Sequence, residues 1–532
     1  MRYLTVLLFF TLITSLLVCC GEQNVPQKDK PERPNILFIV VDDLGNHDLG
    51  VTGSKIYETP HIDGIAAHGT MFTAGYANSA VCSPSRASLL SGRYVTNHGV
   101  TDWIGAKTGE AWREQKRSNK LLPPDYEHRL SPVFTTLPEV LKQRNYRTFF
   151  AGKWHLGGEQ QASLPTNHGF DVNVGGFHGG SPANGRYFAP FNNPQMADYP
   201  ADKGQCLSER LASETASFLE QKDTTPFFAM LSFYGVHGPI QTSQPKWKKY
   251  RDKIVAMGVA DDGFKMGRML PIRQVQDDPI YAGLVEQVDD AVGIVLEKLE
   301  ELNLADNTIV VFTSDNGGVA AGDNYSTSNA PLRGGKGYQF EGGTRVPYFI
   351  YIPWLKQAPK TNSTPVMGMD LYPTLVELAG GTSSSSIDGT SLLPLLTGNT
   401  LPKRPLFWHY PHYGNQGGEP SSTVRYGDYK LIRYWEDDRR ELYQLSNDPG
   451  EQNDIFAKEP EAAANLDRRL SEWLRATDAR IPLTDPAYAP AKEAAVFQRF
   501  ATKKMPYLEE LRKQRLTEDY QPNKDWWGSA VD

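Results

Sequence analysis

The feature that most constrains the fold is a series of short apolar runs that recur along the chain. They lie at residues 35–41, 148–151, 227–232, 309–313 and 347–352. Such runs are typical of strands that are buried on both faces of a mainly parallel sheet. Between them apolar residues recur every three or four positions, most clearly over residues 280–302, as in amphipathic helices. The alternation predicts an α/β domain whose central, mostly parallel sheet is flanked by helices.

A change in sequence texture near residue 400 predicts a second, smaller domain. Residues 401–485 contain short runs separated by turns, as in an antiparallel sheet. We therefore expect a large domain over residues 34–400, a small C-terminal α+β domain over 401–485, and a helical or extended tail over 486–532. On the long helix of the large domain, Asp289 and Asp290 are expected to face solvent.

Composition limits the classes of ligand. The chain has 532 residues and a formal net charge of −7, which leaves no basic surplus for nucleic acid. An anionic ligand would have to be bound by local cations. The four cysteines, Cys19, Cys20, Cys82 and Cys206, are too few for a disulfide framework. A single bridge between Cys82 and Cys206 is one interpretation of the remaining pair.

The N-terminus has the features of an export signal. Residues 4–18 form an apolar run that is short for a membrane span and fits a signal-peptide core. Residues 17–20, Leu-Val-Cys-Cys, overlap the end of this run and resemble a bacterial lipoprotein box, with Cys20 as the lipidated residue. Ordinary cleavage near Gly21 is the alternative. We expect a leader over residues 1–20, a polar linker over 21–33, and a periplasmic or cell-surface protein whose only membrane attachment is a lipid at Cys20.

Polar residues follow several of the predicted strands, at the sheet edge where open parallel sheets bind ligands. Asp42 and Asp43 follow the first run, and Asp315 and Asn316 follow a later one. These oxygen ligands suit Ca²⁺ or Mg²⁺ far better than Zn²⁺. Neighbouring buried carboxylates also repel unless a cation neutralises them. The plainer alternative is that one residue of each pair caps a helix. Other runs lead into Lys153, His155 and His237.

The segment that begins at Cys82 predicts a helix with a reactive N-terminus. Pro84 suits a first turn and Gly92 suits the end of the helix. Free N–H groups and the helix dipole favour anions at residue 82, so the thiol could be a nucleophile of low pKa. A soft thiolate is nevertheless a poor neighbour for a metal held by oxygen ligands.

A family resemblance resolves this mismatch. The sequence C-x-P-S-R followed by A-S-L-L-S-G-R, from Cys82 to Arg93, resembles the signature of the type I, formylglycine-dependent sulfatases. This family belongs to the alkaline-phosphatase-like superfamily. Further segments resemble the family in the same order, and they lie at residues 33–43, 59–63, 152–157, 314–318, 333–336 and 441–451. The resemblance therefore runs from about Arg33 to beyond Asn453.

The resemblance implies an activity and a set of roles. It implies that Cys82 is oxidised to formylglycine, whose hydrate is an oxygen nucleophile and an oxygen ligand. The maturation would require a formylglycine-generating enzyme or its anaerobic equivalent. It further implies that Arg86, Lys153 and Lys336 hold the sulfate and the diol, that His237 is the general acid, and that His155 is a base near residue 82. The implied metal is Ca²⁺ rather than Mg²⁺, and its implied ligands are Asp42, Asp43, residue 82, Asp315 and Asn316.

The substrate side of the site is less constrained, because it lies on loops. We assign four residues to it, namely Trp103, His178, His409 and His412. For His409 and His412, a place in an aromatic core is the alternative. The expected substrates are sulfated carbohydrates, such as ulvan or carrageenan fragments from algal polysaccharides, or glycosaminoglycans. A phosphonate monoester or phosphodiester hydrolase of the same superfamily is the second functional hypothesis.

Overall fold

A computed structural model describes residues 31–523, apart from residues 222, 356–357 and 385. The predicted leader with Cys20, and most of the predicted linker, lie outside the described residues. Among the described helices, none combines the length and the apolar character that a membrane crossing requires.

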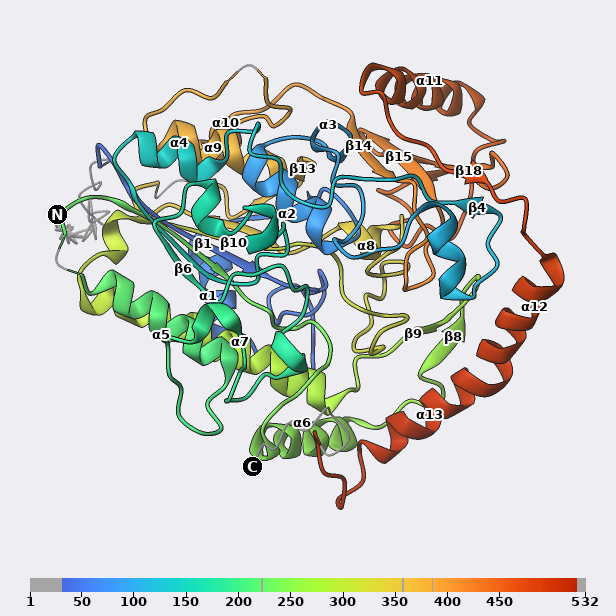
Figure 1. The fold of residues 1–532 in the computed structure, drawn as a ribbon, viewed down its shortest axis with the longest axis horizontal. Coiled ribbons are helices and arrows are strands. Elements are labelled where there is room, and N and C mark those ends of the chain that lie inside the picture. The colour runs from blue at the N-terminus through green and yellow to red at the C-terminus, as the bar shows by residue number, and fades with distance from the viewer. Residues whose placement is uncertain (1–30, 222, 356–357, 385, 524–532) are drawn as a thin grey trace, which may run out of the picture.

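The core of the large domain is an eight-stranded sheet in the order β12-β2-β11-β10-β1-β7-β5-β6 (Figure 1). All five apolar runs are strands of this sheet, which confirms the predicted fold class. Strands β10, β1, β7, β5 and β6 are parallel, whereas β11 is antiparallel to both of its neighbours. The strands are β1 (Asn35–Val41), β2 (Thr70–Phe72), β5 (Arg147–Gly152), β6 (Val172–Val174), β7 (Phe227–Ser232), β10 (Thr308–Ser314), β11 (Tyr348–Tyr351) and β12 (Thr361–Asn362).

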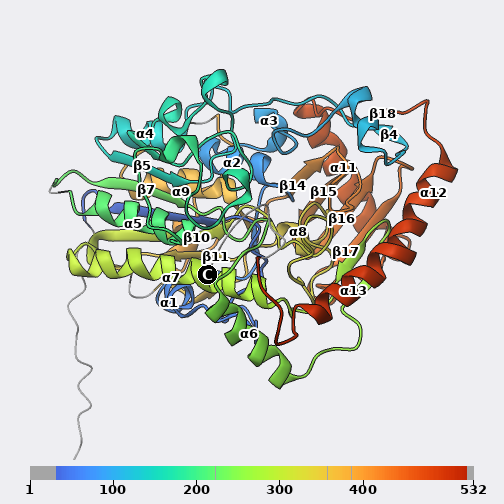
Figure 2. The ribbon, with the colours of Figure 1, turned by 60° about the horizontal axis from the view of Figure 1, so that its bottom comes forward.

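Helices cover both faces of the sheet (Figures 1 and 2). Successive residues of β1 point to opposite faces, so Leu37 and Ile39 belong to one apolar core and Ile36 and Phe38 to the other. One face is covered by α1 (Pro60–His68), α5 (Leu207–Leu219) and α7 (Pro279–Glu301). The other is covered by α2 (Cys82–Ser91), α4 (Leu137–Gln143), α9 (Leu371–Leu378) and α10 (Leu393–Leu396).

The C-terminal part forms a four-stranded antiparallel sheet, as the sequence predicts. Helix α11 packs on it through Leu466 and Leu470, which meet Val424 and Leu431. The elements are β14 (Leu406–Tyr410), β15 (Ser421–Tyr426), β16 (Tyr429–Tyr434), β17 (Arg440–Gln444) and α11 (Pro460–Ala476). The exact domain boundaries remain predictions.

The tail is helical and runs along one edge of the molecule beside a small hairpin (Figure 1). It consists of α12 (Pro490–Arg499), a π-helical turn η8 (Phe500–Lys504) and α13 (Met505–Gln514), and the hairpin is β8 (Phe264–Met266) with β9 (Pro271–Arg273). The remaining short elements are β3 (Gly75–Tyr76), α3 (Val95–His98), β4 (Leu121–Leu122), α6 (Gln244–Met257), α8 (Glu341–Thr344), β13 (Val366–Met367) and β18 (Leu483–Thr484).

One expectation about α7 is wrong. Asp290 is exposed and pairs with Lys246, but Asp289 is buried. Its carboxylate accepts hydrogen bonds from the backbone N–H groups of His61 and Ile62, at 3.3 and 2.8 Å. Asp289 therefore satisfies free donors in the first turn of α1. Sequence periodicity alone does not show that a second helix begins against this face.

Candidate active site

The acidic cluster forms because β1 and β10 are adjacent and end together. Val41 pairs with Ser314 at the last register position, so the residues after each strand meet. Asp42, Asp43 and Asp315 are buried, and carboxylate oxygens of these three residues lie within 4.8 Å of one another. The backbone N–H of Asp43 donates to Asp315 Oδ1 at 3.2 Å, which ties the two strand ends together.

Each carboxylate of the cluster has a buried cationic partner. Lys153 Nζ lies 2.5 Å from Asp42 Oδ2, and Lys336 Nζ lies 2.8 Å from Asp43 Oδ2. Arg86 Nε lies 2.7 Å from Asp315 Oδ2. Arg86 also donates to the Lys153 carbonyl and to Ser232 Oγ, and its Nη2 is buried without a hydrogen-bond partner.

Asn316 provides the test of whether a cation fits this cluster. Its Nδ2 donates to Asp43 Oδ1 at 2.8 Å and to the Gly317 carbonyl at 3.0 Å, so the amide lies against the carboxylates. Its Oδ1 is buried and has no hydrogen-bond partner, which is uncommon for a native protein. Burial, and then the charge of Asp315, raise the pKa of Asp42 well above its usual value. An unpartnered amide oxygen beside mutually repelling carboxylates fits a hard divalent cation.

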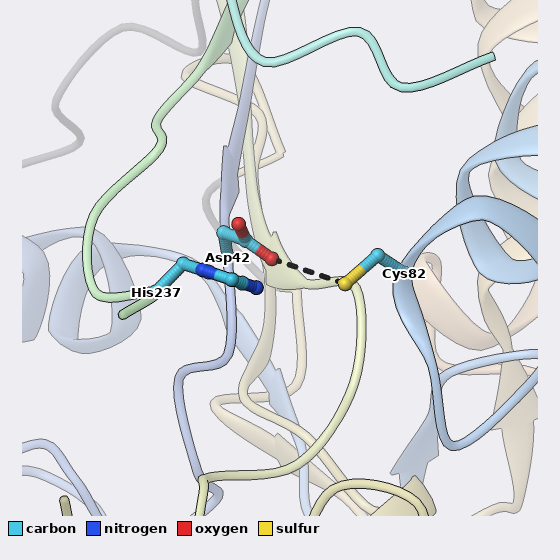
Figure 3. A group of neighbouring side chains, drawn as sticks. All are labelled: Asp42, Cys82 and His237. Atoms are coloured by element: carbon cyan, nitrogen blue, oxygen red, sulfur yellow. Dashed lines mark hydrogen bonds between the residues drawn. The ribbon is translucent and has the colours of Figure 1, made fainter. Parts of the chain in front are cut away.

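Cys82 begins helix α2 and faces the cluster. Its Sγ lies 3.5 Å from Asp42 Oδ1 (Figure 3) and 3.9 Å from Asp43 Oδ1. Gly92 ends the helix in the left-handed conformation, with φ of 67°, as its position predicts. Cys82 and Cys206 are both free thiols, so the bridge between them is not formed. Burial raises the pKa of the Cys82 thiol, and an unmodified thiol here would be a poor nucleophile.

His237 approaches the same carboxylates from the segment after β7. Figure 3 shows its ring reaching past Asp42 towards Cys82, and a ring nitrogen, an Asp42 oxygen and the Cys82 sulfur lie within 4.8 Å of one another. Its Nε2 lies 3.8 Å from Asp43 Oδ2, and its Nδ1 lies 2.6 Å from the Gly238 carbonyl. Nδ1 is therefore the donor, which leaves Nε2 toward the site. Burial, and then Lys336, lower the pKa of His237 to about 3.

His155 has one ring nitrogen committed and one free. Its Nε2 donates to the Ile104 carbonyl at 3.1 Å, whereas its Nδ1 is buried without a hydrogen-bond partner. Burial, followed by the charge of Lys153, lowers the pKa of His155 well below its usual value. The ring is therefore neutral, and Nδ1 is an available proton acceptor.

These groups meet at a cavity of about 340 Å³. Cys82, His155, His237 and Lys336 line it, whereas Arg86 and Lys153 are buried behind it. A nucleophile position, candidate proton donors and acceptors, and the cation of Lys336 thus share one cavity.

Comparison with known proteins identifies the family. The family model described as Sulfatase matches residues 34–381, which is more than half of the chain. The chain belongs to the sulfatase family. It is a sulfuric ester hydrolase, and the resemblance inferred from its motifs is confirmed. A second model, described as N-sulphoglucosamine sulphohydrolase, C-terminal, matches residues 335–479.

Similar proteins span most of this sulfatase. A sulfatase of Formosa agariphila is 31% identical over 89% of this chain and 94% of its own. Human N-acetylgalactosamine-6-sulfatase is 33% identical over 71% of this chain and 69% of its own. The crystal structure of Ps i-CgsB in complex with k-i-k-neocarrahexaose superimposes with a TM-score of 0.67 and 25% identity, and covers 90% of this chain and 100% of that one.

The predicted substrate-side residues of the sulfatase divide into two pairs. Trp103 and His178 line the cavity beside Cys82. His409 and His412 are buried and do not line this cavity, and their place on the substrate side stays a prediction. His409 lies in β14 and is buried, with its nitrogens 2.7 Å from Ser422 Oγ and 2.8 Å from the Arg480 carbonyl. His412 is buried and lies 2.9 Å from Thr101 Oγ1, next to aromatic rings.

Sequence reasoning missed other polar residues of the cavity. The segment that carries the two histidines continues to Asn415 and Gln416, which do line it, as do Asp323 and Ser181. The glycines at 414, 417 and 418 mark a tight turn that carries these amides to the site. That turn was the available signal, since loop polar groups between glycines are common at binding sites.

Proposed function

We propose that this sulfatase removes sulfate from carbohydrates, with a formylglycine made from Cys82 and a Ca²⁺ ion held by Asp42, Asp43, Asp315 and Asn316. The observation that carries the proposal is the position of residue 82, between the acidic cluster and an open cavity lined by His237 and Lys336. The names of relatives support a carbohydrate substrate, because they include a galactosamine sulfatase and a complex with a neocarrahexaose.

The charges of the site match a sulfate ester. Asp42, Asp43 and Asp315 are balanced by Arg86, Lys153 and Lys336, so their formal charges cancel. A hydrated aldehyde at residue 82 supplies the attacking oxygen and a release hydroxyl, and a divalent ion supplies two further positive charges. The site is then positive and attracts an anionic ester. Lys336, which lines the cavity, holds a sulfate oxygen.

In this proposal one histidine donates a proton and another accepts one. His237 protonates the leaving alcohol, because a sugar alkoxide is a poor leaving group. Its pKa is low without substrate, and an adjacent sulfate favours the charged ring. His155 accepts a proton at Nδ1, the nitrogen without a partner.

Replacing His237 with alanine tests the proton donor. We expect kcat/KM for a sugar sulfate to fall about 10²- to 10⁴-fold, and to fall much less for 4-nitrophenyl sulfate, whose phenolate leaves unprotonated. His155→Ala is the matched comparison, since a base at residue 82 should affect both substrates alike. Sulfate release is measured by ion chromatography. Equal losses for both substrates in His237→Ala would remove His237 from the acid role.

A substrate panel tests the function. The mature enzyme is assayed on carrageenan, ulvan and chondroitin sulfate oligosaccharides, on 4-nitrophenyl sulfate and on a phenylphosphonate monoester. We expect sulfate release from at least one oligosaccharide class at a kcat/KM well above that for the aryl ester. Activity on aryl sulfate alone would contradict a carbohydrate substrate, and faster phosphonate hydrolysis would favour the second hypothesis. Family membership favours sulfate.

We also propose that the protein is exported, periplasmic or at the cell surface, with a lipid at Cys20. The apolar run and paired cysteines of the leader support this. Because the proposed nucleophile is a formylglycine, the protein also requires a maturation enzyme that oxidises Cys82.

A further inference from the structure

A second cavity adjoins the one beside Cys82. Its volume is about 570 Å³, and Asp323 and Asn415 line both cavities. The two cavities therefore lie side by side, with Asp323 and Asn415 between them. None of the catalytic roles proposed above involves a residue that lines only this second cavity.

The second cavity is strongly basic. Five basic side chains line it, and Asp323 is the one carboxylate among its lining residues; the cations are Lys116, Arg117, Arg268, Arg499 and Lys504. Arg268 is neutralised by Glu419 and Glu436. Within residues 31–523, as far as the structure describes them, the other four form no ion pair with a carboxylate. Their charge is available to an anionic ligand.

Arg117 is held in place without being neutralised. Its Nη1 donates to the Gly414 carbonyl and its Nη2 to Asn415 Oδ1, both at 3.1 Å. A guanidinium has further N–H donors. Burial lowers the pKa of Arg117, and the nearby charge of Asp323 offsets that effect only in part. A half-buried cation fixed by neutral groups is a device for binding an anion.

Lys504 faces the same cavity from the tail. Its Nζ lies 5.8 Å from the ring centre of Tyr325 and 4.9 Å from that of Tyr507. Burial lowers its pKa, and no anion opposes that effect. Val496, Phe500 and Lys504 all line the cavity at intervals of four, so one face of the α12–η8 helix forms its wall.

The helical wall lies outside the segments that the family models match. The family models match residues 34–381 and 335–479, and the tail lies beyond both. The turn that carries Phe500 and Lys504 is π-helical, a rare conformation that is frequent at functional sites.

We propose that the second cavity is a subsite for another anionic group, a sulfate or a carboxylate, on the sugar next to the one that is desulfated. The inference rests on the proposed carbohydrate function and narrows it. The substrate is then an oligosaccharide or polysaccharide with repeated negative charges. Arg117 and Lys504 bind the second anion, and Tyr325 and Phe500 provide flat apolar surface for the sugar ring.

Binding without turnover tests the subsite. Cys82→Ala protein, which lacks the proposed nucleophile, is titrated with two probes by calorimetry. One is a carrageenan hexasaccharide, which carries sulfate only, and the other is a chondroitin sulfate hexasaccharide, which also carries carboxylates. We expect Lys504→Gln to raise Kd for at least one probe about tenfold, and Lys504→Glu to raise it further. Added salt should reduce the difference in Kd between wild type and these variants. A response to the carrageenan probe shows that the subsite binds sulfate, and a response to the chondroitin probe alone favours a carboxylate.

Lys503→Gln is the matched control, because Lys503 is the exposed neighbour and does not line the cavity. In mature enzyme, Lys504→Gln should also lower the ratio of kcat/KM for the responding hexasaccharide to kcat/KM for 4-nitrophenyl sulfate about tenfold. If wild type binds and desulfates a hexasaccharide but Lys503→Gln and Lys504→Gln behave alike, the subsite is overturned and the proposed function stands. If no hexasaccharide binds or loses sulfate, the proposed function and the subsite both fail.

Discussion

Replacing Cys82 with alanine is expected to lower kcat/KM for every sulfate ester by at least about 10⁴-fold. In the proposed chemistry, the oxygen that attacks sulfur derives from residue 82. Ser83, the next residue, donates its hydroxyl to the His155 carbonyl at 2.9 Å and does not line the cavity. The change removes few atoms at a helix start, so we expect a folded protein that still binds substrate.

Cys206 provides the matched control for Cys82. It is also a buried free thiol, but it lies in the apolar core before α5. Cys206→Ala should keep more than about half of the activity, with at most a modest loss of stability. Mass spectrometry of the peptide that contains residue 82 completes the experiment, since active wild type should show aldehyde in place of thiol. Fully active wild type that retains the thiol would contradict the formylglycine proposal, and so would substantial activity in Cys82→Ala.

Local sequence determined much of the fold, and the reasons are physical. Strands such as β1 and β7 are buried on both faces, so their apolar runs stand out without knowledge of their neighbours. The acidic cluster was predictable because parallel strands end at a common edge. The pairing of Asp42 with Lys153 and of Asp315 with Arg86 is shown only by the structure, since sequence spacing says nothing about contacts across a sheet.

The features that the sequence analysis did not predict are all contacts between distant segments. The Asp289 carboxylate accepts a hydrogen bond from the first turn of α1, and His409 contacts Ser422 and the Arg480 carbonyl. Tertiary packing decides which polar groups are buried in this way. The basic cavity beside the site was also not foreseen. Arg117 and Lys504 both line this cavity, but they lie in segments that share no motif, so only the fold shows that they are close.

Removing the divalent cation with EDTA is expected to lower kcat/KM more than about 10³-fold. Without the cation, Asp42, Asp43 and Asp315 pair with the basic side chains that should hold sulfate. Lys336, for example, stays 2.8 Å from Asp43 and is not available to the ester. Added Ca²⁺ should restore activity better than Mg²⁺, because a cluster of carboxylate and amide oxygens suits Ca²⁺, whereas Mg²⁺ usually keeps several waters. Elemental analysis of the purified protein should find about one bound ion per chain.

Asn316→Ala separates metal binding from general stability. Loss of its unpartnered Oδ1 should raise the free Ca²⁺ concentration for half-maximal activity at least about tenfold. Asp48→Asn is the control: Asp48 follows the same strand, but its carboxylate accepts hydrogen bonds from Tyr281 and Thr327, each at 2.7 Å. That change should lower the free energy of unfolding by about 1–3 kcal/mol and leave the Ca²⁺ requirement unchanged. Equal Ca²⁺ requirements in the two variants would mean that Asn316 is not a ligand, and full activity of metal-free protein would exclude the cation from the reaction.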